Sequence, residues 1–150
     1  MQSASVPYAS DAPAHFSLSR GQTAAPNSWD MAIATTPEFS TELQTNFYMP
    51  TLLFNHQKDI EVAIIDSLDY DDMMHEPAGM SWMMDSSSNH SFGNGGVNQV
   101  LVYHPEPPYN HKVLVENPAL VYLVKTSTQT YKLQFKDYSS GIVVFAYDAL

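Results

Sequence analysis

The sequence contains no cysteine among its 150 residues. This absence excludes disulfides, zinc–thiolate sites, iron–sulfur clusters, covalently attached c-type haem and cysteine nucleophiles. The length predicts a single domain over residues 1–150. A domain of this size can bury a real core without disulfides or a structural metal.

Basic residues are scarce as well. One Arg and five Lys stand against sixteen acidic residues, and the net charge is −10. A protein that binds nucleic acid or an anionic membrane surface needs a basic footprint, so both partners are disfavoured. No apolar run approaches the roughly 18 residues of a membrane-spanning helix. Residues 1–4 show neither the pattern of a signal peptide nor a lipid-anchor cysteine.

Sequence signatures of enzymes are also missing. There is no nucleophile elbow, no P-loop and no dinucleotide-binding fingerprint. His75 and Glu76 do not form a zinc-protease motif, because Pro77 would obstruct the helix that carries it. The acidic segment 69–72 lacks the glycine and the final glutamate of a calcium loop. We therefore expect that the protein is not an enzyme.

What the chain does contain is a series of short strand patterns. The last three predicted strands follow one another in meander order, and the first two are joined by a hairpin at 127–129. Residues 68–75 are the main helix candidate, and the first fifteen residues predict a frayed end or an edge strand. The fold class is therefore all-β and mostly antiparallel, with little helix. The predicted strands cover 15–19, 29–35, 60–65, 97–104, 119–126, 131–136 and 142–147, and 42–48 is a weaker strand candidate.

Methionine and histidine are concentrated in the centre of the chain. Thioether sulfur and imidazole nitrogen are neutral ligands of soft and borderline metals, including haem iron. The simpler interpretation is that methionine fills gaps in the core and that the histidines are ordinary loop residues. Trp82, Phe92 and Tyr103 are interspersed with the Met and His residues of this cluster, which are Met73, Met74, His75, Met80, Met83, Met84, His90 and His104.

His104 differs from the other histidines in its position. It ends a predicted strand and precedes Pro105, so rigid backbone would fix it on both sides, as an axial ligand requires. The alternative is a half-exposed loop histidine. His111, seven residues later, can line the same binding pocket as His104. His90 is a further candidate ligand.

Two parts of the sequence together resemble the HmuY-like haem-binding proteins. In the first half the similar segments are 15–21, 29–33 and 45–46, which include a Phe-Ser strand, a Trp-Asp strand and a later Asn. In the last third, segments 121–125, 131–138 and 141–147 follow the closing three strands of that family in order and spacing. The resemblance spans most of the chain, although the middle is shorter than in the family.

This resemblance implies an all-β HmuY-like domain that captures haem b (iron protoporphyrin IX) without a covalent bond. It implies a haemophore-like carrier in haem and iron acquisition by Bacteroidota, located outside the cell or on the outer-membrane surface. Its partners would be haem, host or environmental haemoproteins, and an outer-membrane haem receptor. Two axial side chains would hold the iron and leave no open position for oxygen chemistry.

The resemblance also implies where the ligands lie. One axial ligand of the family follows a strand just before the closing hairpin, and that position matches His104. The other lies earlier, where this chain offers Met73, Met74 and His75. We expect further contacts with haem from Met80, Met83, Met84, Tyr103 and His111.

A second hypothesis assigns the protein to a different class, a surface β-module that binds glycan or protein and no haem. Trp82, Tyr103 and Tyr109 would then form a stacking platform, with the serines at 86–88 as a polar loop. The methionines would serve only as packing.

Overall fold

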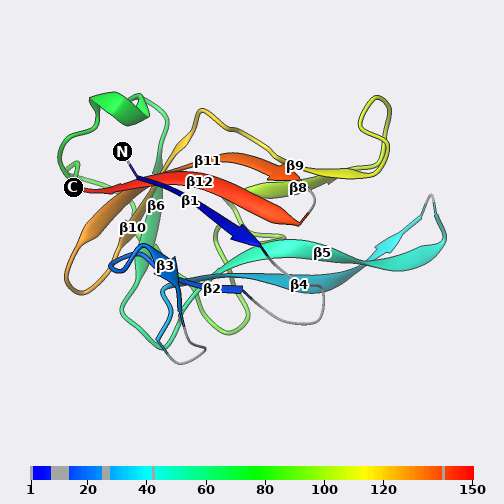
Figure 1. Cartoon of the computed structure of the whole chain (residues 1–150), viewed down its shortest axis with the longest axis horizontal. Coiled ribbons are helices and arrows are strands. Elements are labelled where there is room, and N and C mark those ends of the chain that lie inside the picture. The colour runs from blue at the N-terminus through cyan, green and yellow to red at the C-terminus, as the bar shows by residue number, and fades with distance from the viewer. Residues whose placement is uncertain (1, 8–13, 25–27, 42, 140) are drawn as a thin grey trace.

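Alternating apolar residues in the last third of the chain form the centre of a six-stranded antiparallel sheet (Figure 1). The computed structural model describes residues 2–7, 14–24, 28–41, 43–139 and 141–150. Across the sheet the strands are β1 (Gln2–Pro7), β12 (Ile142–Ala149), β11 (Thr130–Ser139), β10 (Val121–Lys125), β6 (Glu61–Ile65) and β7 (Met83–Met84).

A second, four-stranded sheet packs against the first. Its long hairpin, β4 with β5, projects beyond the rest of the sheet (Figure 1). In order across this sheet the strands are β3 (Gln22–Thr23), β2 (Ala14–Ser17), β4 (Met31–Ser40) and β5 (Thr45–Phe54). A separate two-stranded ribbon consists of β8 (Leu101–His104) and β9 (Lys112–Val115).

The main core lies between the two sheets. Phe16 of β2 meets Phe145 of β12 edge to face, with ring centroids 5.2 Å apart. Phe92, from the long loop between β7 and β8, inserts between Phe54 and Tyr122 at centroid distances of 5.3 and 4.8 Å. Edge-to-face aromatic pairs stabilise a core beyond the area that they bury. A loop residue therefore helps to join the two layers.

The other face of the six-stranded sheet is also covered. Along β10, Tyr122 and Val124 face the main core, whereas Val121 and Leu123 face a smaller cluster on the opposite side. Tyr70 and Met73 cover that cluster, at and just after the single-turn 3-10 helix η1 (Tyr70–Asp72). Burial on both faces explains why β10 reads as a nearly continuous apolar run rather than as an alternating one.

The predicted all-β class is confirmed, since every strand pairing between described residues is antiparallel. The helix candidate at 68–75 is reduced to the three residues of η1. Within residues 1–15 the structure gives the edge strand β1, and 8–13 lie outside the described residues. No helix in the described part of the chain is long and apolar enough to cross a membrane.

Candidate functional site

The residues predicted to bind the iron are not brought together. η1, which precedes Met73, Met74 and His75, lies toward one end of the long axis, and the end of β8 with His104 lies toward the other (Figure 1). Met73 is buried in the smaller cluster, and Met80 packs at its edge. Met74 is 67% exposed and His75 is also exposed, on the outside of the same loop.

Both ring nitrogens of His104 face carboxylates. Nδ1 lies 3.2 Å from Oε1 of Glu106, and Nε2 lies 3.1 Å from Oε2 of Glu116. The hydrogen bond with Glu106 and then that with Glu116 raise the pKa of His104 above its ordinary value, and the protonated ring donates to both. With a carboxylate oxygen at each ring nitrogen, neither nitrogen faces an open position where iron could bind. In this arrangement His104 is the centre of an ion-pair cluster.

The other aromatic residues of this ribbon are engaged nearby. The Tyr103 hydroxyl and Nδ1 of His111 form a short hydrogen bond, and the two rings stack at a centroid distance of 5.9 Å. Tyr109 lies against the His104 ring at 5.0 Å. Trp82 packs at the edge of the smaller cluster, so the proposed platform of Trp82, Tyr103 and Tyr109 does not form one surface.

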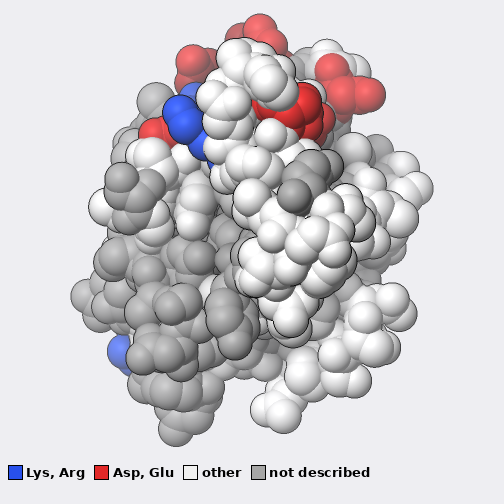
Figure 2. Space-filling model, turned by 90° about the vertical axis from the view of Figure 1, so that its right-hand side faces the viewer, with Lys and Arg blue, Asp and Glu red and all other residues white. Residues whose placement is uncertain are grey.

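The surface around the ribbon is acidic. Figure 2 looks onto the right-hand end of Figure 1 and shows acidic side chains gathered at the top of that face, with Lys or Arg side chains beside them. Glu106 and Glu116 next to His104 add two carboxylates to this region. Haem carries two propionates, which such a surface repels. Geometry and charge therefore both disfavour this end of the molecule as a haem site.

A different part of the Met/His cluster does assemble into a cleft. β7 and the loop that follows it enclose a hollow of about 300 Å³, which we call the 83–97 cleft. Two methionines and one histidine of the cluster share this lining with the apolar side chain of Val97. The lining residues are Met83, Met84, Ser88, Asn89, His90, Ser91, Asn94, Gly95, Gly96 and Val97.

A buried carboxylate holds the histidine of this cleft. Nδ1 of His90 lies 3.4 Å from Oδ2 of Asp85, whose side chain is only 1% exposed. Backbone amides of Phe54 and Ser91 donate to the two oxygens of the same carboxylate, at 3.2 and 2.9 Å. Within the described part of the chain, Nε2 of His90 has no hydrogen-bond partner. The ring is therefore oriented through Nδ1, and the lone pair of Nε2 is free to coordinate a metal.

Glycines allow the loop to fold tightly beneath this histidine. A Cβ atom on Gly96 would lie 2.1 Å from the carbonyl oxygen of His90, and one on Gly93 would lie 2.7 Å from that of Leu52. Neither space admits a side chain unless the backbone moves. Close backbone packing therefore requires glycine at positions 93 and 96.

Sequence reasoning ranked His90 behind His104 and did not single out Asp85 at all. A usable signal was present, because a carboxylate five residues before a histidine, followed by a glycine-rich turn, is an arrangement that can orient an imidazole. Among the described residues no group of three or more His, Asp or Glu side chains is placed to hold a bare metal ion. The cleft thus offers thioether sulfur and imidazole nitrogen as ligand atoms, rather than a set of carboxylate oxygens.

Comparisons with models of known protein families, with curated proteins and with solved structures gave no match.

Proposed function

We propose that the protein binds haem non-covalently in the 83–97 cleft, with His90 as one axial ligand and Met84 or Met83 as the other. The observation that carries the proposal is the pairing of His90 with the buried carboxylate of Asp85 in a cleft that also contains two thioethers. Imidazole and thioether are the axial ligands of haem in low-spin carrier and electron-transfer proteins.

The apolar surface of the cleft suits a flat aromatic ligand. Val97 is 78% exposed and Met84 is 53% exposed, although both are apolar and both line the cleft. Covering such surface contributes about 25 cal/mol per Å². Methionine also adapts its shape readily, which helps a shallow site to close on a rigid macrocycle. These side chains would supply apolar contact area, and His90 would determine where the iron sits.

The size of the cleft favours a carrier. About 300 Å³ is at the lower end of the range for small-molecule sites, so one edge of a haem would stay open to solvent and to a partner. Two axial ligands would leave the iron no free position for oxygen chemistry. Haem capture and delivery outside the cell, as the HmuY-like resemblance implies, is the role that fits these properties.

Titration of the protein with haemin tests this proposal. We expect a saturable shift of the Soret band and a low-spin spectrum in the wild type. His90→Ala should weaken binding by more than about tenfold and abolish the low-spin spectrum. His104→Ala, the matched control, should change neither, because that ring faces Glu106 and Glu116.

The opposite result would favour the assignment made from sequence. If His104→Ala abolishes the low-spin spectrum and His90→Ala leaves it intact, the ribbon end of the molecule binds the iron. If the wild type gives no saturable Soret shift at all, haem binding itself is refuted.

A further inference from the structure

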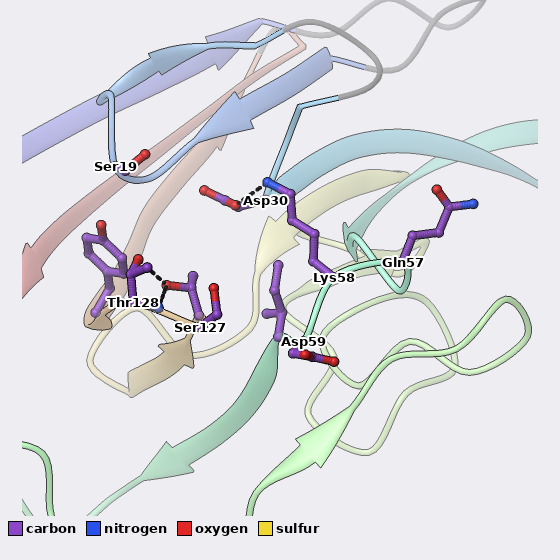
Figure 3. A pocket seen from close by; sticks show the side chains of 10 residues that line it. Ser19, Asp30, Gln57, Lys58, Asp59, Ser127 and Thr128 are labelled. Atoms are coloured by element: carbon purple, nitrogen blue, oxygen red, sulfur yellow. Dashed lines mark hydrogen bonds and ion pairs between the residues drawn. The ribbon is translucent and has the colours of Figure 1, made fainter.

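A second pocket lies where three loops meet (Figure 3). It encloses about 350 Å³, which is within the range of about 300–1,000 Å³ for small-molecule sites. The loops follow β2, β5 and β10, and almost every residue that they contribute is polar. The lining consists of Ser19, Asp30, Gln57, Lys58, Asp59, Ile60, Thr126, Ser127, Thr128 and Tyr131.

A fixed ion pair crosses this pocket. Nζ of Lys58 lies 3.0 Å from Oδ1 of Asp30, as the dashed line in Figure 3 marks. Oδ2 of Asp30 accepts a hydrogen bond from the backbone amide of Leu18 at 2.9 Å. The Asp30 side chain is only 10% exposed, so its position is set by the fold, whereas Lys58 reaches it from solvent. The pocket therefore presents a charged donor and a charged acceptor side by side.

Around this pair are polar groups that the fold does not use. Within the described residues, the side-chain oxygens of Ser127, Asp59 and Tyr131 make no hydrogen bond to the protein and are open to solvent. Burial, and then the negative charge of Asp30, raise the pKa of Tyr131 above its ordinary value. A tyrosine hydroxyl is a donor at neutral pH. Donors and acceptors left unpaired in a preformed hollow are typical of a site that recognises a polar ligand.

The charge balance determines the kind of ligand. Two carboxylates, Asp30 and Asp59, outnumber the one ammonium group of Lys58. A phosphate or carboxylate ligand would meet net repulsion. A metal ion would have to displace Lys58 from Asp30. A neutral molecule with several hydroxyl groups meets neither obstacle, because each hydroxyl both donates and accepts. Adjacent hydroxyls could bond to the carboxylate of Asp30 and the ammonium of Lys58 together, and bonds to charged groups are the stronger ones.

We infer that this pocket binds one neutral monosaccharide unit, held by the Asp30–Lys58 pair and by the Ser127 hydroxyl. This second site is independent of the haem site proposed above, since the two share no lining residue. It gives the protein a way to attach to a glycan while the 83–97 cleft remains accessible.

Backbone amide NMR shifts, recorded during titration with single sugars, test the inference. Glucose, galactose, mannose and N-acetylglucosamine are the probes, and inorganic phosphate, glucuronate and glycerol are the comparison ligands. We expect at least one neutral sugar to give saturable shifts at Lys58, Ser127 and Tyr131. Phosphate and glucuronate should give none, and glycerol should give only weak, unsaturated ones.

Two variants and a control assign the site. Lys58→Met removes half of the ion pair and should weaken sugar binding by about tenfold or more. Ser127→Trp leaves the ion pair intact and fills the hollow, so it should abolish the shifts. Lys125→Met is the matched control, because Lys125 is equally exposed and is paired with Glu76 outside this pocket. It should bind like the wild type.

Several results would overturn the inference. They are the absence of saturable shifts with every sugar, saturation by phosphate or glucuronate instead, equal binding of glycerol, or undiminished binding by Ser127→Trp. A well-dispersed spectrum of each variant establishes that it is folded. A haemin titration of the same samples should be unchanged, so failure at this pocket is distinguishable from failure of the haem proposal.

Discussion

The side-chain ammonium of Lys132 lies 4.2 Å from the centre of the Tyr70 ring and also donates a hydrogen bond to the Tyr70 carbonyl oxygen. Lys132 is buried on β11, and Tyr70 belongs to η1. This contact therefore attaches the loop between β6 and β7 to the second face of the six-stranded sheet. The hydroxyl of Tyr70 adds a bond to Asp148 of β12, at 3.0 Å.

Replacing Lys132 should weaken the attachment of the loop between β6 and β7 to the sheet. Lys132→Met keeps an apolar side chain of similar length and loses both the charge over the ring and the bond to the carbonyl. We expect the free energy of unfolding to fall by about 1–2 kcal/mol, measured by urea denaturation. Lys112→Met, at an exposed position on β9, is the control and should change it by less than about 0.5 kcal/mol. Equal stability of the two variants would contradict the prediction.

The carboxylate of Asp85 should control haem affinity without touching haem. Asp85→Asn retains one acceptor for the backbone amides but weakens the hold on Nδ1 of His90. Loss of such an orienting partner lowers affinity by about 10–100-fold, which a haemin titration measures. Asp59→Asn, a change to an exposed carboxylate outside the cleft, should leave the affinity unaltered.

Two neighbouring glycines should respond differently to alanine. In Gly96→Ala the new Cβ meets the carbonyl oxygen of His90 at 2.1 Å, so the loop must move and haemin binding should be lost. In Gly95→Ala the Cβ meets nothing within 4 Å, and only the positive φ of 79° opposes it. That strain costs about 1 kcal/mol, so Gly95→Ala should still bind. The same loss in both variants would argue against a tightly packed loop.

The protonation of His104 should depend on its two glutamates. Its raised pKa means that the folded state binds the proton more tightly than the unfolded chain. The resulting stabilisation is complete below the unfolded pKa, about 6.5, and is lost as pH rises through the folded value. NMR titration of the ring protons should give a midpoint above 6.5. Glu106→Gln should lower it more than Glu116→Gln, because the hydrogen bond with Glu106 is the largest cause. A titration midpoint of about 6.5 for His104 in the wild type would refute the ion-pair cluster of His104 with Glu106 and Glu116.

The central strands could be predicted because both local pattern and burial favour them. β6, β10, β11 and β12 are rich in β-branched and aromatic residues. β10 with β11, and β11 with β12, also pair in simple hairpins. The Pro37 region was harder to predict. The strand expected at 29–35 ends before Pro37, whereas β4 continues to Ser40. Among described residues β2 pairs with β4 only at 31–33, so Pro37 faces an unpaired edge where no amide is needed.

The position of the candidate haem site could not be predicted from the sequence, because it depends on contacts between residues that lie far apart in the chain. The prolines at 105–108 correctly signalled the end of a strand, but they did not reveal that β9 returns beside β8. That return brings Glu116 within reach of Nε2 of His104. Likewise, the burial of Asp85 depends on the amide of Phe54, which lies 31 residues earlier. Contacts between such distant residues follow from the packing of sheets and leave no local pattern.

The pairing of β1 with β12 sets Gln2 opposite Tyr147, and thereby joins two strands that lie far apart in the sequence. In synthesis from the ribosome, β1 has to wait until β12 has been made, because β12 is the strand that it pairs with among the described residues. Loop closure over such a separation must be achieved before the pairing contributes any stability, so folding is expected to be slow for a protein of this size. Until β12 arrives, β11 keeps an open edge that can recruit a strand from another molecule.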